Sequence, residues 1–122
     1  MVTARKLDLS QQLTRTEQTS LRAFVRKLNE QLGNEVVKVV LFGSKARGNS
    51  DIDSDIDVLV LVKEENRSLK DLIILIASRV SLDHDVLISP RTIGYDRWQR
   101  MGEECFSLYR NISRDGILLL ET

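Results

Sequence analysis

Four aspartates stand at every second position of a short segment that leads into an apolar run. They are Asp51, Asp53, Asp55 and Asp57, and residues 58–62 (VLVLV) follow directly. Side chains two residues apart on a strand project from the same side, so Asp55 and Asp57 point together if a strand starts near residue 54. Two carboxylates on one side repel each other unless a cation lies between them, and ligation by oxygen alone suits Mg²⁺ or Mn²⁺. The pattern predicts a metal site.

A Gly-Ser pair with basic residues behind it lies upstream of the aspartates. Gly43 has no side chain, so its backbone can approach a polyanion closely. Ser44 can cap residues 45–47 and present its hydroxyl and the first free N–H groups to a phosphate. Lys45 and Arg47 add positive charge, and the fork of Arg47 fits phosphate oxygens, although Lys45 equally fits an ordinary surface charge. One strand would thus end in a phosphate-binding turn, and the next would begin with a pair of carboxylates. This arrangement predicts a metal ion that bridges the phosphate and the carboxylates.

A third carboxylate can come from residues 85–88, which read as a short strand. If this strand neighbours residues 58–62, Asp85 can complete a three-oxygen cluster with Asp55 and Asp57. Asp83 shares a face with Asp85 if the strand starts early, so the choice between them stays open, although Asp85 lies closer to the apolar run.

Alternating helices and strands must position these residues. Thr14 and Glu17 fit a capping box that opens a helix closed by Gly33. The other expected elements are a buried strand over 36–42, a strand over 58–62, a helix capped between Ser68 and Asp71, a strand over 85–88, a helix opened by Ser89-Pro90, a helix around 106–112 that stops near Gly116, and an edge strand over 117–120.

The connections between these elements predict the fold class. The first two strands are separated by only about eleven residues, too few for a parallel crossover, so they should be antiparallel. Residues 63–81 hold a full helix, so the second and third strands can be parallel with a right-handed connection. We therefore expect an α/β (α+β) fold: a small mixed sheet flanked by helices, in a single domain over residues 1–122.

Composition excludes several classes of protein. The chain has 122 residues, 42% of them hydrophobic and 30% charged, with 18 basic and 18 acidic side chains. This balance argues against direct nucleic-acid binding. One cysteine (Cys105) and one histidine (His84) exclude a disulfide framework and a multi-Cys/His zinc site. No apolar run approaches the ~20 residues that span a bilayer, and no signal peptide is recognisable, so we expect a cytoplasmic protein.

The motif as a whole resembles a known signature. Gly43-Ser44, ten further residues and Asp55-Ile56-Asp57 resemble the GSx10DxD pattern of the DNA-polymerase-β-type nucleotidyltransferase superfamily, and FGSKARG…SDIDVLV resembles its minimal (MNT-type) members. The resemblance covers residues 17–89 well and the C-terminal third loosely. It selects Asp55 and Asp57 over the overlapping pairs 51/53 and 53/55. It implies a polymerase-β-like fold, a nucleotide triphosphate held at Gly43 and Ser44, and Asp55, Asp57 and Asp85 as metal ligands and catalytic carboxylates.

The same resemblance implies an activity and a partner. Minimal nucleotidyltransferases often pair with a small helical HEPN-type protein, as antitoxins that resemble enzymes transferring AMP from ATP to a tyrosine of the HEPN ribonuclease. We expect this chain to do the same, since about thirty residues after the third strand are too few for an acceptor domain of its own. Two alternatives stay open: a non-catalytic nucleotide-binding module that neutralises a partner, and a small-molecule (aminoglycoside-type) nucleotidyltransferase that works as a homo-oligomer.

Overall fold

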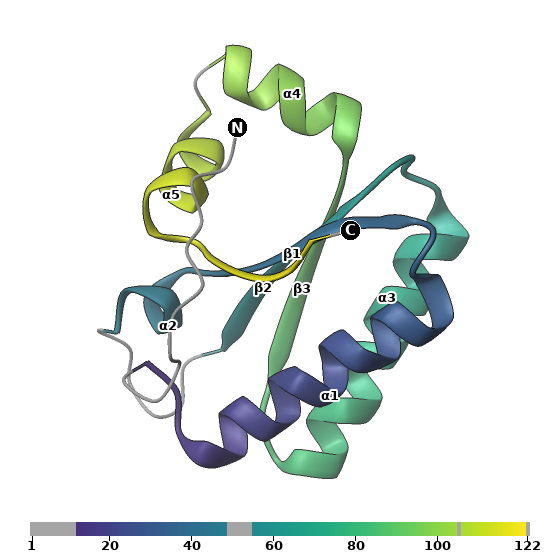
Figure 1. The fold of residues 1–122 in the computed structure, drawn as a ribbon, viewed down its shortest axis with the longest axis vertical. Coiled ribbons are helices and arrows are strands. Elements are labelled where there is room, and N and C mark those ends of the chain that lie inside the picture. The colour runs from purple at the N-terminus through teal and green to yellow at the C-terminus, as the bar shows by residue number, and fades with distance from the viewer. Residues whose placement is uncertain (1–11, 49–54, 105, 122) are drawn as a thin grey trace.

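A four-stranded sheet runs through the middle of the molecule and has helices on both faces (Figure 1). The computed structural model describes residues 12–48, 55–104 and 106–121. The elements, in chain order, are α1 (Arg15–Leu32), β1 (Val36–Phe42), α2 (Ser44–Arg47), β2 (Ile56–Val62), α3 (Arg67–His84), β3 (Ile88–Gly94), α4 (Tyr95–Glu103), α5 (Ser107–Asp115) and β4 (Ile117–Glu121).

The sheet is mixed, with strand order β3-β2-β1-β4. β1 and β2 pair antiparallel, and the longer connection through α3 makes β2 and β3 parallel. β4 pairs antiparallel with β1 and forms one edge of the sheet. These three pairings confirm the predicted mixed sheet, the antiparallel first pair and the edge position of the last strand.

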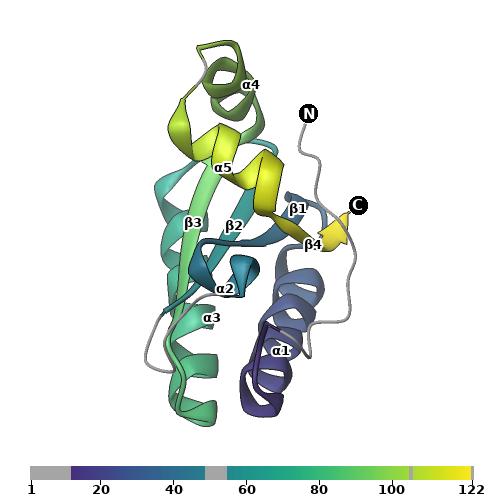
Figure 2. The same cartoon turned by 90° about the vertical axis from the view of Figure 1, so that its left-hand side faces the viewer.

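Helices α1 and α3 cover one face of the sheet (Figure 2). The predicted capping box opens α1, because the Thr14 side chain accepts a hydrogen bond from the Glu17 N–H and the Glu17 side chain accepts one from the Thr14 N–H. Asn66 caps α3 by accepting from the Leu69 N–H at 2.8 Å, so the helix starts slightly before the predicted cap between Ser68 and Asp71. The larger core cluster lies between these helices and the sheet, with Phe24 wholly buried at its centre.

Helices α4 and α5 cover the opposite face. Alternate residues of β2 and β3, among them Leu59, Leu61 and Ile93, pack there against Trp98 and Ile112 in a second, smaller core cluster. Every second side chain of a strand reaches the same face. The alternation therefore assigns the odd-numbered residues of β2 and β3 to the side of α4 and α5, which decides where the aspartates point.

The predicted third strand was wrong in its bounds. Asp85 ends α3 in the left-handed region (φ 54°, ψ 45°), and the Val86 N–H donates to the Ser81 carbonyl at 3.1 Å. The Ser81 hydroxyl also accepts from the Ile88 N–H at 3.0 Å, so the chain turns over residues 85–87 and pairs as β3 only from Ile88. Ser89 and Pro90 consequently lie inside β3 instead of opening a helix. Proline is tolerated there because β3 is an edge strand.

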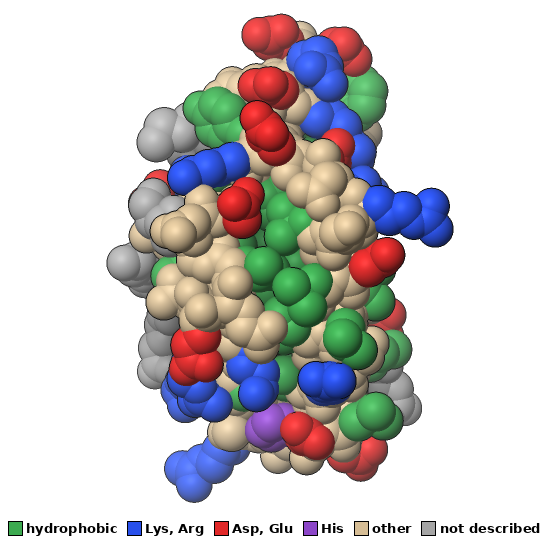
Figure 3. Space-filling view, turned by 90° about the vertical axis from the view of Figure 1, so that its right-hand side faces the viewer, with side chains coloured by type: hydrophobic (Ala, Val, Ile, Leu, Met, Phe, Trp, Pro, Cys, Tyr) green, Lys and Arg blue, Asp and Glu red, His purple; other side chains and the backbone are tan. Residues whose placement is uncertain are grey.

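The outer surface of α3 is partly apolar. Ile74 is 53% exposed, Leu75 44% and Leu82 84%. Figure 3 shows the side of the molecule on which α1 and α3 lie, with apolar side chains along its middle and polar ones on both sides. Within the described ranges, no helix is both long enough and apolar enough to cross a membrane.

Candidate active site

The two predicted halves of the site meet where β1 ends and β2 begins. Phe42, the last residue of β1, pairs with Asp57 in the antiparallel register, so Gly43 follows directly beside this aspartate. Asp55 and Asp57 differ by two positions, and Asp57 shares its face of β2 with Leu59, which packs under α4 and α5. The site therefore opens on the α4/α5 side of the sheet.

Gly43 is required at this point by both conformation and space. Its φ is +77°, a conformation that residues with a Cβ rarely adopt, and a Cβ built on it would collide with the Oδ2 atom of Asp57. Gly43 is also the N-cap residue of α2, and it has no side chain that could cap this helix start. Ser44 was predicted to cap residues 45–47, but it is itself the first helical residue. The missing side chain of Gly43 is what brings the N-terminus of α2 beside the carboxylate.

The carboxylate of Asp57 is held in an unfavourable electrostatic setting. Burial raises its pKa above the ordinary aspartate value, and the charge of Asp55 raises it further, whereas Arg91 and Arg47 lower it. No described residue forms a hydrogen bond or ion pair with the Asp57 side chain. A carboxylate that is desolvated next to a second carboxylate favours a proton or a metal cation.

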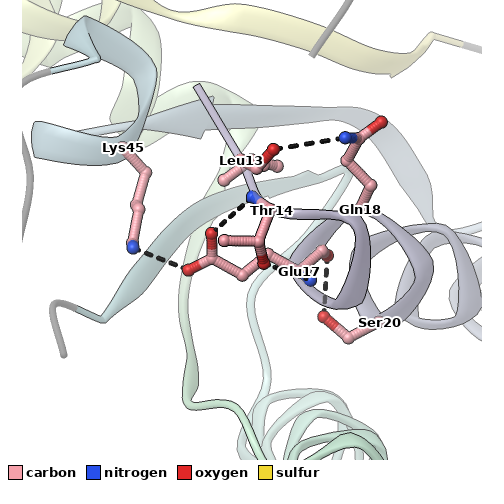
Figure 4. Close-up of polar contacts among 6 residues, drawn as sticks. All are labelled: Leu13, Thr14, Glu17, Gln18, Ser20 and Lys45. Atoms are coloured by element: carbon pink, nitrogen blue, oxygen red, sulfur yellow. Dashed lines mark hydrogen bonds and ion pairs between the residues drawn. The ribbon is translucent and has the colours of Figure 1, made fainter. Parts of the chain in front are cut away.

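Lys45 lies in a different place from the phosphate-binding turn that the sequence predicted. Its side chain is only 3% exposed, and its Nζ forms an ion pair of 2.6 Å with Glu17 Oε2 (Figure 4). The other oxygen of the same carboxylate, Oε1, accepts the Thr14 N–H at 2.8 Å in the capping box. Glu17 thus ties the first turn of α1 to α2. The role of Lys45 in nucleotide binding stays a prediction, and its reading as an ordinary surface charge is wrong.

Two residues of β3 that sequence reasoning missed belong to the site. The Ser89 hydroxyl donates to Asp55 Oδ2 at 3.1 Å, and Ser89 pairs with Asp57 in the parallel register of β2 and β3. Arg91 lies two residues further along the same face, close enough for its charge to lower the pKa of Asp57. Arg47, exposed at the end of α2, acts on Asp57 from the β1 side. Placing the strand at 88–94 instead of 85–88 would have identified Ser89 and Arg91.

The third carboxylate is not gathered with the other two. Asp85 is exposed at the turn after α3, and Asp83 lies within that helix. Among the residues that the structure describes, no three Asp, Glu, His or Cys side chains lie close enough together to hold one metal ion. Asp51 and Asp53 lie outside the described residues. A role for Asp85 therefore stays a prediction.

Comparison with known protein families now decides the class of protein. The family model of the nucleotidyltransferase domain matches residues 21–118, which include both halves of the site. The chain belongs to the nucleotidyltransferase family. This nucleotidyltransferase is 48% identical over 71 residues to "Putative protein adenylyltransferase MJ0141" of Methanocaldococcus jannaschii, a match covering 57% of the chain and 72% of the relative. "Putative protein adenylyltransferase MJ0604" of the same organism is 26% identical over 103 residues, covering 84% of the chain and 97% of the relative.

Solved structures confirm the fold of this nucleotidyltransferase. A structure described as a "putative minimal nucleotidyltransferase" superimposes with a TM-score of 0.58 at 25% identity, covering 93% of the chain and 97% of that structure. A crystal structure of the toxin–antitoxin pair MntA-HpeT contains a chain with a TM-score of 0.54 at 20% identity, covering 80% of this chain and 70% of that one. At that identity the second likeness concerns the fold alone. The predicted α/β fold of a minimal nucleotidyltransferase is therefore confirmed.

Proposed function

We propose that this nucleotidyltransferase transfers AMP from ATP to a hydroxyl group of a partner protein. The observation that carries the proposal is the contact between the Gly43 turn and Asp57, which joins an α2 N-terminus to a pair of carboxylates. Phosphate binding and metal binding are thus adjacent, as nucleotidyl transfer requires. The protein acceptor is supported by two relatives, each described as a "putative protein adenylyltransferase".

The donor set of the site fits a divalent metal ion. Nucleotidyltransferases generally use such an ion with a nucleoside triphosphate, and Mg²⁺ is usually held by one or two carboxylates together with substrate phosphates. Asp55 and Asp57 supply two such carboxylates, and the pKa of Asp57 is raised by its burial and by the charge of Asp55, which Arg91 and Arg47 offset only in part. Bound Mg²⁺ or Mn²⁺ would supply charge stabilisation to the reacting phosphoryl group. Because of the family resemblance, we propose Asp85 as a third metal ligand or as the general base.

The chain's own residues supply binding and orientation. The N–H groups at the start of α2, the Ser44 hydroxyl and the Arg47 guanidinium would bind the β- and γ-phosphates of ATP. The acceptor oxygen forms a bond to the α-phosphorus, the bond from this phosphorus to the bridging oxygen of the β-phosphate breaks, and pyrophosphate leaves. The proton of the acceptor hydroxyl passes to a base, for which Asp85 is the candidate.

The proposed partner is a small HEPN-type ribonuclease, and the proposed role of the chain is that of its antitoxin in the cytoplasm. The supporting observation is the resemblance of the Gly43–Asp57 motif to minimal nucleotidyltransferases that pair with such proteins. The common fold with a chain of the MntA-HpeT pair agrees with this proposal.

Intact-mass spectrometry tests the proposal directly. The chain and the small protein encoded beside it are incubated with ATP and Mg²⁺, and an Asp55→Asn, Asp57→Asn double variant serves as the control. A mass gain equal to AMP on the neighbour, absent with the double variant, is expected. A stable complex without any gain would instead identify a non-catalytic binding module, and transfer to an aminoglycoside but to no protein would identify a small-molecule enzyme.

A further inference from the structure

A pocket lined by arginines lies on the same face of the sheet as the aspartate pair. It has a volume of about 320 Å³, and Arg91, Arg97 and Arg100 line it together with Met101 and Phe106. Arg91 and Ile93 are two residues apart on β3, so their side chains lie on the same face of the sheet. Ile93 is buried under α4, and the Arg91 side chain therefore lies on the face of Asp55 and Asp57. We call these three arginines and their two apolar neighbours the arginine pocket.

The charge of the arginine pocket is only partly compensated. Arg97 donates to Glu65 Oε1 at 3.0 Å, and Glu104 is the one acidic side chain in the pocket lining. Neither Arg91 nor Arg100 forms a hydrogen bond or ion pair with another described residue. Guanidinium groups bind carboxylates through two parallel hydrogen bonds, while Phe106, 48% exposed, offers an apolar surface beside them. The pocket therefore fits an anionic group attached to an apolar or flexible chain.

The position of the pocket relative to Asp57 indicates which substrate uses it. The strand order puts the Gly43 turn on the β1 side of Asp57 and Arg91 on the β3 side. In an in-line displacement the attacking oxygen and the leaving pyrophosphate lie on opposite sides of the reacting phosphorus. If the β- and γ-phosphates lie at Gly43, the acceptor approaches from the β3 side, where the arginine pocket is.

We infer that the arginine pocket binds an acidic segment of the acceptor protein and so delivers the acceptor hydroxyl to the site. The identity of the acceptor rests on the proposed function, whereas the charge and position of the pocket do not. Because Arg100 lies on α4, away from the aspartate pair in the chain and with no described partner, it can be changed without touching the catalytic residues.

The test is a charge reversal with a matched control on the other face of the molecule. Arg100→Glu is compared with Arg79→Glu, which alters an exposed arginine of α3, and with Arg100→Gln, which removes the charge without reversing it. Affinity for the small protein encoded beside the chain is measured without nucleotide, and KM values for that protein and for ATP are measured during transfer. Circular dichroism melting checks that all three variants fold.

Arg100→Glu should weaken binding of the acceptor and raise its KM by about tenfold or more, since like charges at an interface are strongly unfavourable. Arg100→Gln should have a smaller effect, and Arg79→Glu and the KM for ATP should not change. A raised KM for ATP with an unchanged KM for the acceptor would overturn the inference and assign the pocket to the nucleotide. Equal effects of Arg79→Glu and Arg100→Glu would also overturn it. Weakened binding by Arg100→Glu in a chain that transfers no AMP would retain the inference and refute the proposed function.

Discussion

Glu17 is buried against Lys45 of α2 and Asp57 is half-buried beside Gly43 at the start of the same helix, and the surroundings of these two carboxylates differ. Glu17 has a cation on one oxygen and a backbone N–H on the other, at 2.6 and 2.8 Å. Asp57 has a second carboxylate as its neighbour, and two arginines act on it only at a distance. Glu17 is thus satisfied by its protein partners, whereas the Asp57 side chain has no hydrogen-bond or ion-pair partner among the described residues.

This difference distinguishes a structural carboxylate, Glu17, from the carboxylate that we propose to be functional, Asp57. A buried charge that is paired and hydrogen-bonded holds neighbouring segments together, and removing one partner is costly. A carboxylate kept next to a like charge costs the folded state free energy, which is regained when a proton or a metal cation binds. Substitutions at the two positions should therefore change different properties.

Asp57→Asn should have the largest effect, and on activity. If Asp57 binds the metal as proposed, its loss should reduce the proposed AMP transfer by about a thousandfold, equivalent to ~4 kcal/mol of transition-state stabilisation. The same variant should melt at a higher temperature than the wild type without metal, because the raised pKa of Asp57 marks an unfavourable charge. Transfer assays and melting curves with and without MgCl₂ measure both effects, and Asp71→Asn, exposed on α3, is the control. A variant with nearly full activity would refute the catalytic role of Asp57.

Glu17→Gln should have the next largest effect, and on stability. The amide can still accept the Thr14 N–H, but the buried Lys45 ammonium loses its ion pair with Glu17. We expect the free energy of unfolding, measured by urea denaturation, to fall by about 3 kcal/mol. The double variant Glu17→Gln, Lys45→Met should recover part of this loss, because it also removes the buried positive charge that the ion pair had compensated. A change below about 0.5 kcal/mol in the single variant would show that the ion pair is unimportant.

Gly43→Ala and Gly48→Ala form a matched pair at the two ends of α2. Both glycines have positive φ, +77° and +75°, so each substitution should cost about 1 kcal/mol of strain. Only at Gly43 would the new methyl group collide with Asp57, since at Gly48 the nearest atom among the described residues is Gln12 Cγ at 3.9 Å. Gly43→Ala should therefore also reduce transfer by about tenfold or more through displacement of the carboxylate. Equal activity of the two variants would argue against the Gly43–Asp57 contact as the basis of the site.

The smallest effect should be the pH dependence caused by Asp57. Its folded-state pKa lies above the unfolded value, so the folded protein binds the proton more tightly between these two values. The metal-free wild type should then lose stability relative to Asp57→Asn as the pH rises from about 4 through the raised pKa. Solvent screens a half-buried carboxyl, which keeps the effect small. Melting temperatures of the two proteins across this pH range, measured in EDTA, should diverge as the pH rises, and parallel curves would contradict the pKa shift.

Both ends of β1 were predicted correctly, because a run of β-branched and other apolar residues ends at a glycine. The sequence also predicted the capping box of α1 and the pairing directions of the strands. It failed after α3, because the left-handed conformation of Asp85 and the Ser81 hydrogen bonds have no local signature. Because the bounds of this strand were predicted wrongly, Ser89 and Arg91 were not recognised as residues of the site. The Lys45–Glu17 pair could not be anticipated either, since lysine is rarely buried and its partner is distant in sequence.

The two hydrophobic core clusters differ in size, and this difference has a consequence for local motion. Among the described residues, twenty form the buried cluster that includes α1 and α3, and seven form the cluster under α4 and α5. Segments with few buried apolar residues open at a lower free energy than the rest of a fold. The α4–α5 layer, which carries most of the arginine pocket, should therefore open locally at a lower free energy than the layer of α1 and α3. An acceptor bound at the arginine pocket would then contact a segment that opens more easily, whereas the nucleotide would contact the more stable strands β1 and β2.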